Sequence, residues 1–128
     1  MRILLDTHLL LWAMAASRKL PPTVKAQVLD PANDIYFSAA SLWEIAIKRG
    51  LRREDFRIDL DALMAALRES GFLELPIAAM HAIGVAQLPP IHKDPFDRLL
   101  VAQSMAEPMT LLTNDATLAD YWDGVKVV

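Results

Sequence analysis

Cysteine is absent from the 128 residues of the chain. Disulfides and thiolate metal ligands are therefore excluded, and a metal ion would have to bind through oxygen or histidine. The histidines are His8, His81 and His92, and they form no H-x-x-x-H pair or similar spacing. A zinc site is thus a weak alternative, and oxygen atoms are the better candidates for metal ligands.

Long apolar runs are also lacking. The first apolar segment, Ile3–Leu5, is too short to cross a membrane or to act as a secretory signal, and Asp6 ends it. We therefore expect a cytoplasmic protein without membrane contact. Hydrophobic residues still make up 54% of the composition, which is ample for the core of one domain spanning residues 1–128.

A basic excess is missing as well, because the net charge is −3. Phosphate binding usually shows as an excess of positive charge, so a nucleic-acid partner is disfavoured at first sight. If the acidic residues described below share a bound cation, however, the remaining surface is near neutral. Local basic clusters then matter more than the total charge.

Short apolar segments alternate with helical patterns along the chain. The segment 2–6 shows no polar alternation before its last residue, which is typical of a parallel strand covered on both faces. The expected strands are 2–6, 34–37, 72–75, 110–113 and 125–128, and the expected helices are 9–16, 23–29, 42–49, 61–70, 77–87, 94–106 and 118–122. This order predicts a three-layer α/β/α sandwich with a mainly parallel central sheet.

Acidic residues follow two of the expected strands. Asp6 closes the first strand, and Asp115 lies just past strand 110–113. Ligands of open parallel sheets bind at the carboxyl edge, so both acids would face one rim if the strands are neighbours. Glu44 and Asp97 lie near helix starts and could approach the same rim. Clustered carboxylates need a cation to offset their repulsion, and oxygen ligation suits Mg²⁺ or Mn²⁺.

Three of these acids also have purely structural interpretations. Ser41-x-x-Glu44 matches a capping box, in which Glu44 would return a hydrogen bond to the Ser41 amide. Asp94 resembles an N-cap before a proline, with Asp97 as a first-turn acid favoured by the helix dipole. Asp115 could be an ordinary turn residue. Asp6, which closes the first strand, is the hardest of the acids to explain by a purely structural role.

Four motifs occur in order along the chain, and together they resemble the PIN domain, specifically that of VapC-type toxins. Each motif is modest alone, but their order within so short a chain is specific. The motifs are Leu5-Asp6-Thr7, Ser38-x-x-Ser41-Leu42-Trp43-Glu44-Ile45, His92-Lys93-Asp94-Pro95-Phe96-Asp97-Arg98-Leu99-Leu100 and Leu112-Thr113-Asn114-Asp115.

The resemblance implies a metal-dependent endoribonuclease that acts as the toxin of a bacterial or archaeal toxin–antitoxin pair. It also implies an acidic quartet that holds Mg²⁺ or Mn²⁺ and takes part in RNA cleavage. The quartet is Asp6, Glu44, Asp97 and Asp115.

The same resemblance assigns supporting roles around the quartet. Thr7 is expected to support Asp6 by hydrogen bonding, and Thr113 to act near Asp115. His8 is expected to line the pocket without binding metal, because many relatives have asparagine at this position. The partners implied are a second copy of the chain and a VapB-like antitoxin whose segment lies over the acidic pocket, with helices 39–50 or 60–70 as candidate contact surfaces.

Basic residues near Glu44 and Asp97 are the expected contacts for RNA phosphates, and such contacts should weaken with salt. The alternative is a solvated helix end, in which Lys48 is the surface ion-pair partner of Glu44 four residues earlier. The candidate RNA-binding residues are Lys48, Arg49, Arg52, Arg53, Lys93 and Arg98.

Two other functions remain open from the sequence. A metal-dependent phosphatase or nucleotidase would also place an aspartate after the first strand, but the D-x-D pair is missing because Thr7 and His8 follow Asp6. A non-catalytic interaction module could keep the fold without the chemistry. The retained acids argue against that interpretation.

Overall fold

The computed structural model describes residues 1–51 and 58–128. Within these residues, five parallel strands form one sheet in the order β3-β2-β1-β4-β5. The strands are β1 (Arg2–Leu5), β2 (Asp34–Ser38), β3 (Leu73–Leu75), β4 (Thr110–Thr113) and β5 (Val125–Val127). The predicted strands are thus confirmed, with no end shifted by more than one residue.

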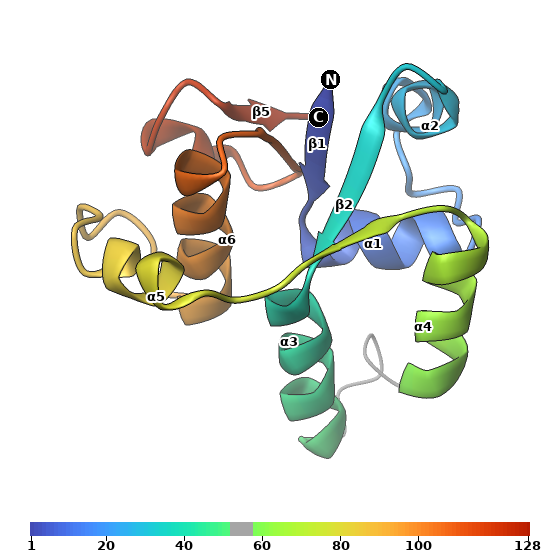
Figure 1. Cartoon of the computed structure of the whole chain (residues 1–128), viewed down its shortest axis with the longest axis horizontal. Helices are drawn as coiled ribbons and strands as arrows, with labels where there is room; N and C mark the ends of the chain where they lie inside the picture. Colours follow the sequence, from blue (N-terminus) through green and yellow to red (C-terminus); the bar gives the residue numbers. More distant parts are fainter. Residues whose placement is uncertain (52–57) are drawn as a thin grey trace.

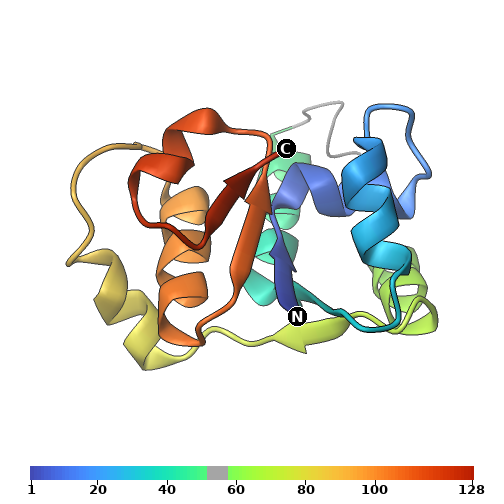
Figure 2. The ribbon, with the colours of Figure 1, turned by 90° about the horizontal axis from the view of Figure 1, so that it is seen from above.

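Helices cover both faces of this sheet, as the α/β/α prediction requires. Helices α1, α2 and α4 lie on one side, and α5 and α6 lie on the other (Figures 1 and 2). The helices are α1 (Thr7–Met14), α2 (Pro22–Leu29), α3 (Ala39–Gly50), α4 (Leu60–Glu69), α5 (Ala79–Val85) and α6 (Pro95–Ala106), with a 3₁₀ helix, η2 (Ala116–Asp120). Among the described residues, none of the helices has the length and apolar character needed to span a membrane.

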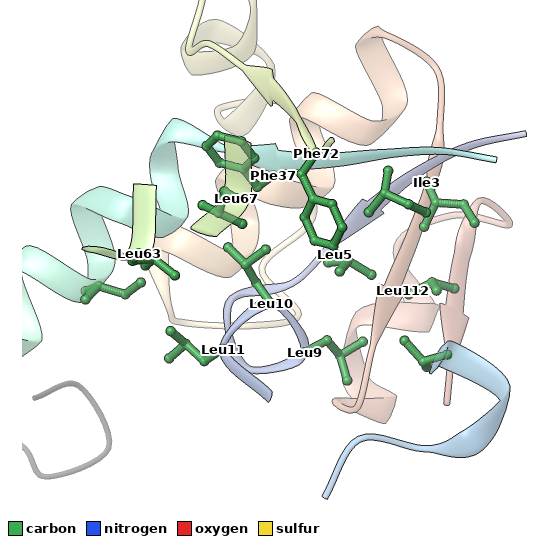
Figure 3. Close-up of a cluster of buried hydrophobic side chains, with 13 residues drawn as sticks. Ile3, Leu5, Leu9, Leu10, Leu11, Phe37, Leu63, Leu67, Phe72 and Leu112 are labelled. Atoms are coloured by element: carbon green, nitrogen blue, oxygen red, sulfur yellow. The ribbon is translucent and has the colours of Figure 1, made fainter. Parts of the chain in front are cut away.

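Strand β1 occupies the centre of the sheet and divides the core into two clusters. Its side chains alternate between the faces, so Ile3 and Leu5 pack with α1, α2 and α4 while Leu4 packs with α6. Figure 3 shows the first cluster, in which the Phe72 ring is drawn next to Leu5 and the Phe37 ring next to Leu67. Burial on both faces explains why β1 carries an unbroken apolar run.

The carboxyl ends of β1 and β4 lie side by side. Leu5 pairs with Leu112, and the backbone N–H of Asp6 donates to the Leu112 carbonyl at 3.0 Å. The residues that follow these strands, Asp6 and Asp115, therefore leave the sheet at the same edge. Their expected convergence depended on β1 and β4 being neighbours, and the sheet order meets that condition.

Helix α3 begins three residues earlier than a cap at Ser41 would place it. The Ser38 hydroxyl accepts a hydrogen bond from the Ala40 amide and caps the helix, so Ser41 lies inside the first turn rather than at the N-cap. The capping-box interpretation of Ser41 and Glu44 is therefore wrong. Because Ser41 needs no reciprocal cap, the carboxylate of Glu44 is available for other partners.

Candidate active site

Asp6 is a buried carboxylate at the sheet edge, with a relative exposure of 4%. It caps α1 by accepting from the Leu9 amide at 2.9 Å, and the Thr113 hydroxyl donates to its second oxygen at 2.6 Å. Burial raises the pKa of Asp6, and these hydrogen bonds oppose that rise. The side chain is thus fixed between α1 and β4, close to the neighbouring strand end.

Asp97 lies in the first turn of α6, where Asp94 is the N-cap and accepts from the amides of Phe96 and Asp97. This confirms the predicted cap and leaves the Asp97 side chain for the pocket. Burial raises the pKa of Asp97 to about 7, and the negative charges of Asp94 and Glu44 act in the same direction. Near neutral pH the Asp97 carboxyl is therefore poised between its protonated and ionised forms.

His92 links two of the carboxylates. Its Nε2 atom lies 2.8 Å from Asp115 and 3.7 Å from Asp97, while its Nδ1 atom accepts from the Asp94 amide at 3.0 Å. Burial would raise the pKa of Asp115, but hydrogen bonds from Thr117 and His92 outweigh it and lower the pKa. Asp115 also caps η2, so the same carboxylate stabilises a helix end and contacts His92.

Glu44 is buried on α3 and has a partner for each oxygen. The Thr7 hydroxyl donates to Oε1 at 2.6 Å, and the ammonium group of Lys48 contacts Oε2. Lys48 also lies 3.8 Å from a carboxylate oxygen of Asp94. Lys48 therefore connects Glu44 on α3 with Asp94 at the N-terminus of α6. The negative charges of these two acids help to raise the pKa of Asp97.

One open pocket of about 380 Å³ is lined by Asp6, Asp97 and Asp115. Among the described residues, one group of histidine and carboxylate ligand atoms lies within 4.8 Å of one another, and it comprises His92, Asp97 and Asp115. Carboxylate oxygens with a single imidazole suit a hard divalent cation that keeps several waters. The residues that line the pocket are Asp6, His8, Asp97, Asn114, Asp115 and Ala116.

Thr7 supports a different acid from the one expected, whereas Thr113 acts next to Asp115 as expected and also bonds Asp6. Thr7 was expected to bond Asp6, but its hydroxyl contacts Glu44 and Ser41, because residue 7 starts α1 on the side that faces α3. Thr113 bonds Asp6 directly and accepts from the backbone amide of Asp115. His8 lines the pocket as expected.

The sequence placed His92 beside Asp97 as a contact for RNA rather than as a metal ligand, and sequence reasoning missed Asn114 as a site residue. The signal for His92 was its position two residues before the N-cap of α6, where the chain must turn back toward the pocket. The proline-rich loop gave no way to predict which direction its side chain would take. Asn114 could have been predicted, because it follows β4 at the same edge as Asp115.

The basic residues predicted to contact RNA differ in their surroundings, because some are bonded to the protein and others are exposed. Arg98 donates to the carbonyl groups of Val85 and Pro89 and to the Tyr121 hydroxyl, so its guanidinium stabilises the loop before α6. Lys48 is engaged with Glu44, while Arg49 and Lys93 are exposed. The predictions for Arg52 and Arg53 lie outside the described residues.

The raised pKa of Asp97 predicts a pH-dependent stability in the metal-free protein. The carboxyl keeps its proton up to about pH 7 when folded, whereas its ordinary pKa is 3.8. Between these values the folded state holds the extra proton, so the free energy of unfolding falls as pH rises, by on the order of 1 kcal/mol per pH unit. Urea unfolding in EDTA at several pH values should show Asp97→Asn losing part of this slope; parallel curves for the two proteins would contradict the prediction.

The chain is thus an α/β/α sandwich with an acidic pocket at the carboxyl edge of its parallel sheet, which is an arrangement suited to binding a metal ion. The PIN domain family model matches residues 3–122, so the chain belongs to the PIN domain family. PIN domains are generally nucleases. No curated protein matches the chain.

Solved structures with a similar fold come from bacterial toxin–antitoxin complexes. The chain is similar to VapBC2 from Rickettsia felis bound to a promoter DNA fragment, with a TM-score of 0.68, 15% identity and coverage of 100% of this chain and 98% of that one. It is also similar to DNA-bound VapBC from Salmonella typhimurium (0.66, 15%, 100% and 97%) and to FitAcB from Neisseria gonorrhoeae (0.63, 22%, 96% and 95%). At these identities the likeness is one of fold.

Proposed function

We propose that the chain is a Mg²⁺- or Mn²⁺-dependent endoribonuclease, formed by a single PIN domain, that serves as the toxin of a toxin–antitoxin pair. The observation that carries the proposal is the acidic pocket, where Asp6 and Asp97 have raised pKa values and Asp115 lies beside them. Such a cluster is electrostatically unfavourable without a cation. PIN nucleases typically use divalent metal ions, which agrees with this requirement.

The carboxylates of Asp6, Asp97 and Asp115 would hold the cation, with His92 as an additional candidate ligand and Glu44 adding negative charge from α3. A bound cation would lower the pKa of a water molecule and neutralise charge on the phosphate. The protein's own contribution is orientation. Thr113 fixes Asp6, and the amide hydrogen bond to Nδ1 of His92 directs Nε2 toward the acids.

The proposed reaction is hydrolysis of the RNA phosphodiester by in-line attack of water. The new bond joins the water oxygen to phosphorus, the bond from phosphorus to the 3′ oxygen breaks, and the leaving oxygen takes up a proton. The products therefore carry 5′-phosphate and 3′-hydroxyl ends. The ribose 2′-hydroxyl plays no part, so no cyclic phosphate forms.

Exposed apolar residues on α3 and at its C-cap support the proposed protein partners. Trp43, Ile47 and Leu51 are all about half exposed or more, and they follow one another at helical spacing. The structural neighbours are complexes of two proteins, toxin with antitoxin. We propose that this chain likewise binds a VapB-like antitoxin, over the acidic pocket, and that two copies of it form a homodimer.

The direct test is to incubate the purified chain with RNA in Mg²⁺ and sequence both ends at each cut. We expect 5′-phosphate and 3′-hydroxyl ends and no cleavage in EDTA, with activity restored by added Mg²⁺ or Mn²⁺. Cleavage that survives EDTA, or 2′,3′-cyclic phosphate ends, would contradict the mechanism. Hydrolysis of small phosphate esters without RNA cleavage would favour the phosphatase interpretation instead.

A further inference from the structure

A second pocket, of about 440 Å³, adjoins the acidic pocket and shares His8 and Asn114 with it. Its volume lies within the range of about 300–1,000 Å³ that is typical of small-ligand sites. The residues come from α1, the loop after α1, the segment before α4 and the turn after β4. They are His8, Leu11, Trp12, Ala15, Ser17, Lys19, Ile58 and Asn114.

The two pockets have opposite chemical character. Three carboxylates line the acidic pocket, whereas the described residues that line the second pocket include no carboxylate and one cation, Lys19. Its walls combine an indole, an imidazole and aliphatic side chains with an amide and a hydroxyl. This combination suits a flat, aromatic and polar-edged ligand, and a nucleobase has that chemistry.

We infer that this second pocket binds the base of the nucleotide next to the scissile phosphate of a single-stranded RNA. The inference rests on the proposed function, because the acidic pocket must hold that phosphate. Asn114 and His8 line both pockets, so one nucleotide step separates the phosphate from the base. The pocket thereby contributes to the choice of cleavage site.

Trp12 provides the stacking surface. Its side chain is partly buried against the α1 core, which holds the ring in place, and it is tilted by 52° from the His8 ring at a centroid distance of 6.0 Å. Because the two rings are not stacked face to face, the contact with His8 does not cover a face of the Trp12 ring. Stacking of a base on a fixed aromatic ring is sequence-tolerant and costs little conformational entropy.

Asn114 and Lys19 complete the recognition. The Asn114 side chain is exposed at the junction of the pockets, and a carboxamide can donate to and accept from a base edge. Lys19 is exposed and lines only the second pocket, where it can contact the phosphate that follows the bound base. The amide therefore supplies base preference, and the lysine supplies affinity that falls with salt.

The test combines an abasic RNA series with a tryptophan variant. The kcat/KM for cleavage is measured in Mg²⁺ for an RNA of known cleavage site and for copies lacking one base at a time. We expect removal of one base beside the cut to lower kcat/KM about tenfold for the wild-type chain, and Trp12→Leu to lower it similarly on the intact RNA. The two losses should not add, because both remove the same contact.

Ile83→Ala is the control, since Ile83 is an exposed apolar residue of α5 outside both pockets. It should remain as sensitive to the missing base as the wild type. Lys19→Gln should reduce the salt dependence for every RNA equally, and circular dichroism checks that each variant is folded. If all abasic RNAs are cut like the intact one, or if Trp12→Leu stays sensitive to the missing base, the base pocket is overturned. If the wild type cuts no RNA, the proposed function falls and the base pocket falls with it.

Discussion

Replacing Asp97 by asparagine should lower the rate of RNA cleavage by at least a hundredfold. The substitution keeps the shape of the side chain but removes the charge that a divalent cation requires, and metal-dependent charge stabilisation contributes several kcal/mol to catalysis. The fold should survive, because Asp94 and not Asp97 caps α6. Single-turnover cleavage of a defined RNA at saturating Mg²⁺ measures the loss, and calorimetric titration with Mn²⁺ should show weakened binding.

The matched control is Asp61→Asn. Asp61 is also a first-turn acid of a helix, α4, but it is exposed and lies outside the acidic pocket. It should cleave RNA at the wild-type rate with a small loss of stability from the helix dipole. An Asp97→Asn protein that cuts as fast as Asp61→Asn would show that the acidic pocket is not catalytic, and the non-catalytic interaction module would become the better interpretation.

Lys48→Met should destabilise the metal-free protein by about 3 kcal/mol. The variant keeps an apolar stem of similar length but leaves the buried Glu44 carboxylate without its ammonium partner, and loss of one member of a buried ion pair is strongly unfavourable. Part of the loss should return in Mg²⁺, because a cation in the adjacent acidic pocket offsets the same negative charge. Urea unfolding in EDTA and in Mg²⁺ measures both effects.

Lys126→Met provides the comparison, since Lys126 is an exposed residue of the edge strand β5. Its effect should stay within about 0.5 kcal/mol, as for most surface substitutions. The double variant Lys48→Met, Glu44→Gln should be more stable than Lys48→Met alone, because it removes the unpaired charge. Equal stability of the two lysine variants would mean that the Lys48–Glu44 pair behaves as a solvated surface pair.

Much of the fold could be predicted because local patterns and tertiary packing agree. The apolar run of β1 indicated burial on both faces, and Asp94 before Pro95 predicted the start of α6 correctly. The alternation of strands and helices then fixed a parallel sheet, since parallel neighbours need crossover connections. The carboxyl edge followed as the place where Asp6 and Asp115 should be found.

Most partners of the site side chains could not be predicted, because they depend on rotations that no local pattern records. The i,i+4 spacing indicated the Lys48–Glu44 pair, but the S-x-x-E spacing also fitted a capping box. Tertiary packing placed the cap three residues earlier and gave Glu44 a second partner, Thr7. Arg98 likewise looked like a phosphate contact beside Asp97. The end of α5 and the irregular loop before α6 present carbonyl groups of Val85 and Pro89 to the guanidinium, and these hydrogen bonds hold the side chain.

The central position of β1 has a consequence for when activity can arise. Strand β1 pairs in parallel with two strands distant in sequence, and Ile3 lies opposite Thr110, near the other end of the chain. Assembly must therefore close loops that span most of the polypeptide, and such nonlocal pairing folds slowly. A copy still being synthesised, with β4 not yet made, has no Thr113 to hold Asp6 and no Asp115 beside it. We expect an unfinished copy to be harmless to RNA, including the RNA of the ribosome that is making it.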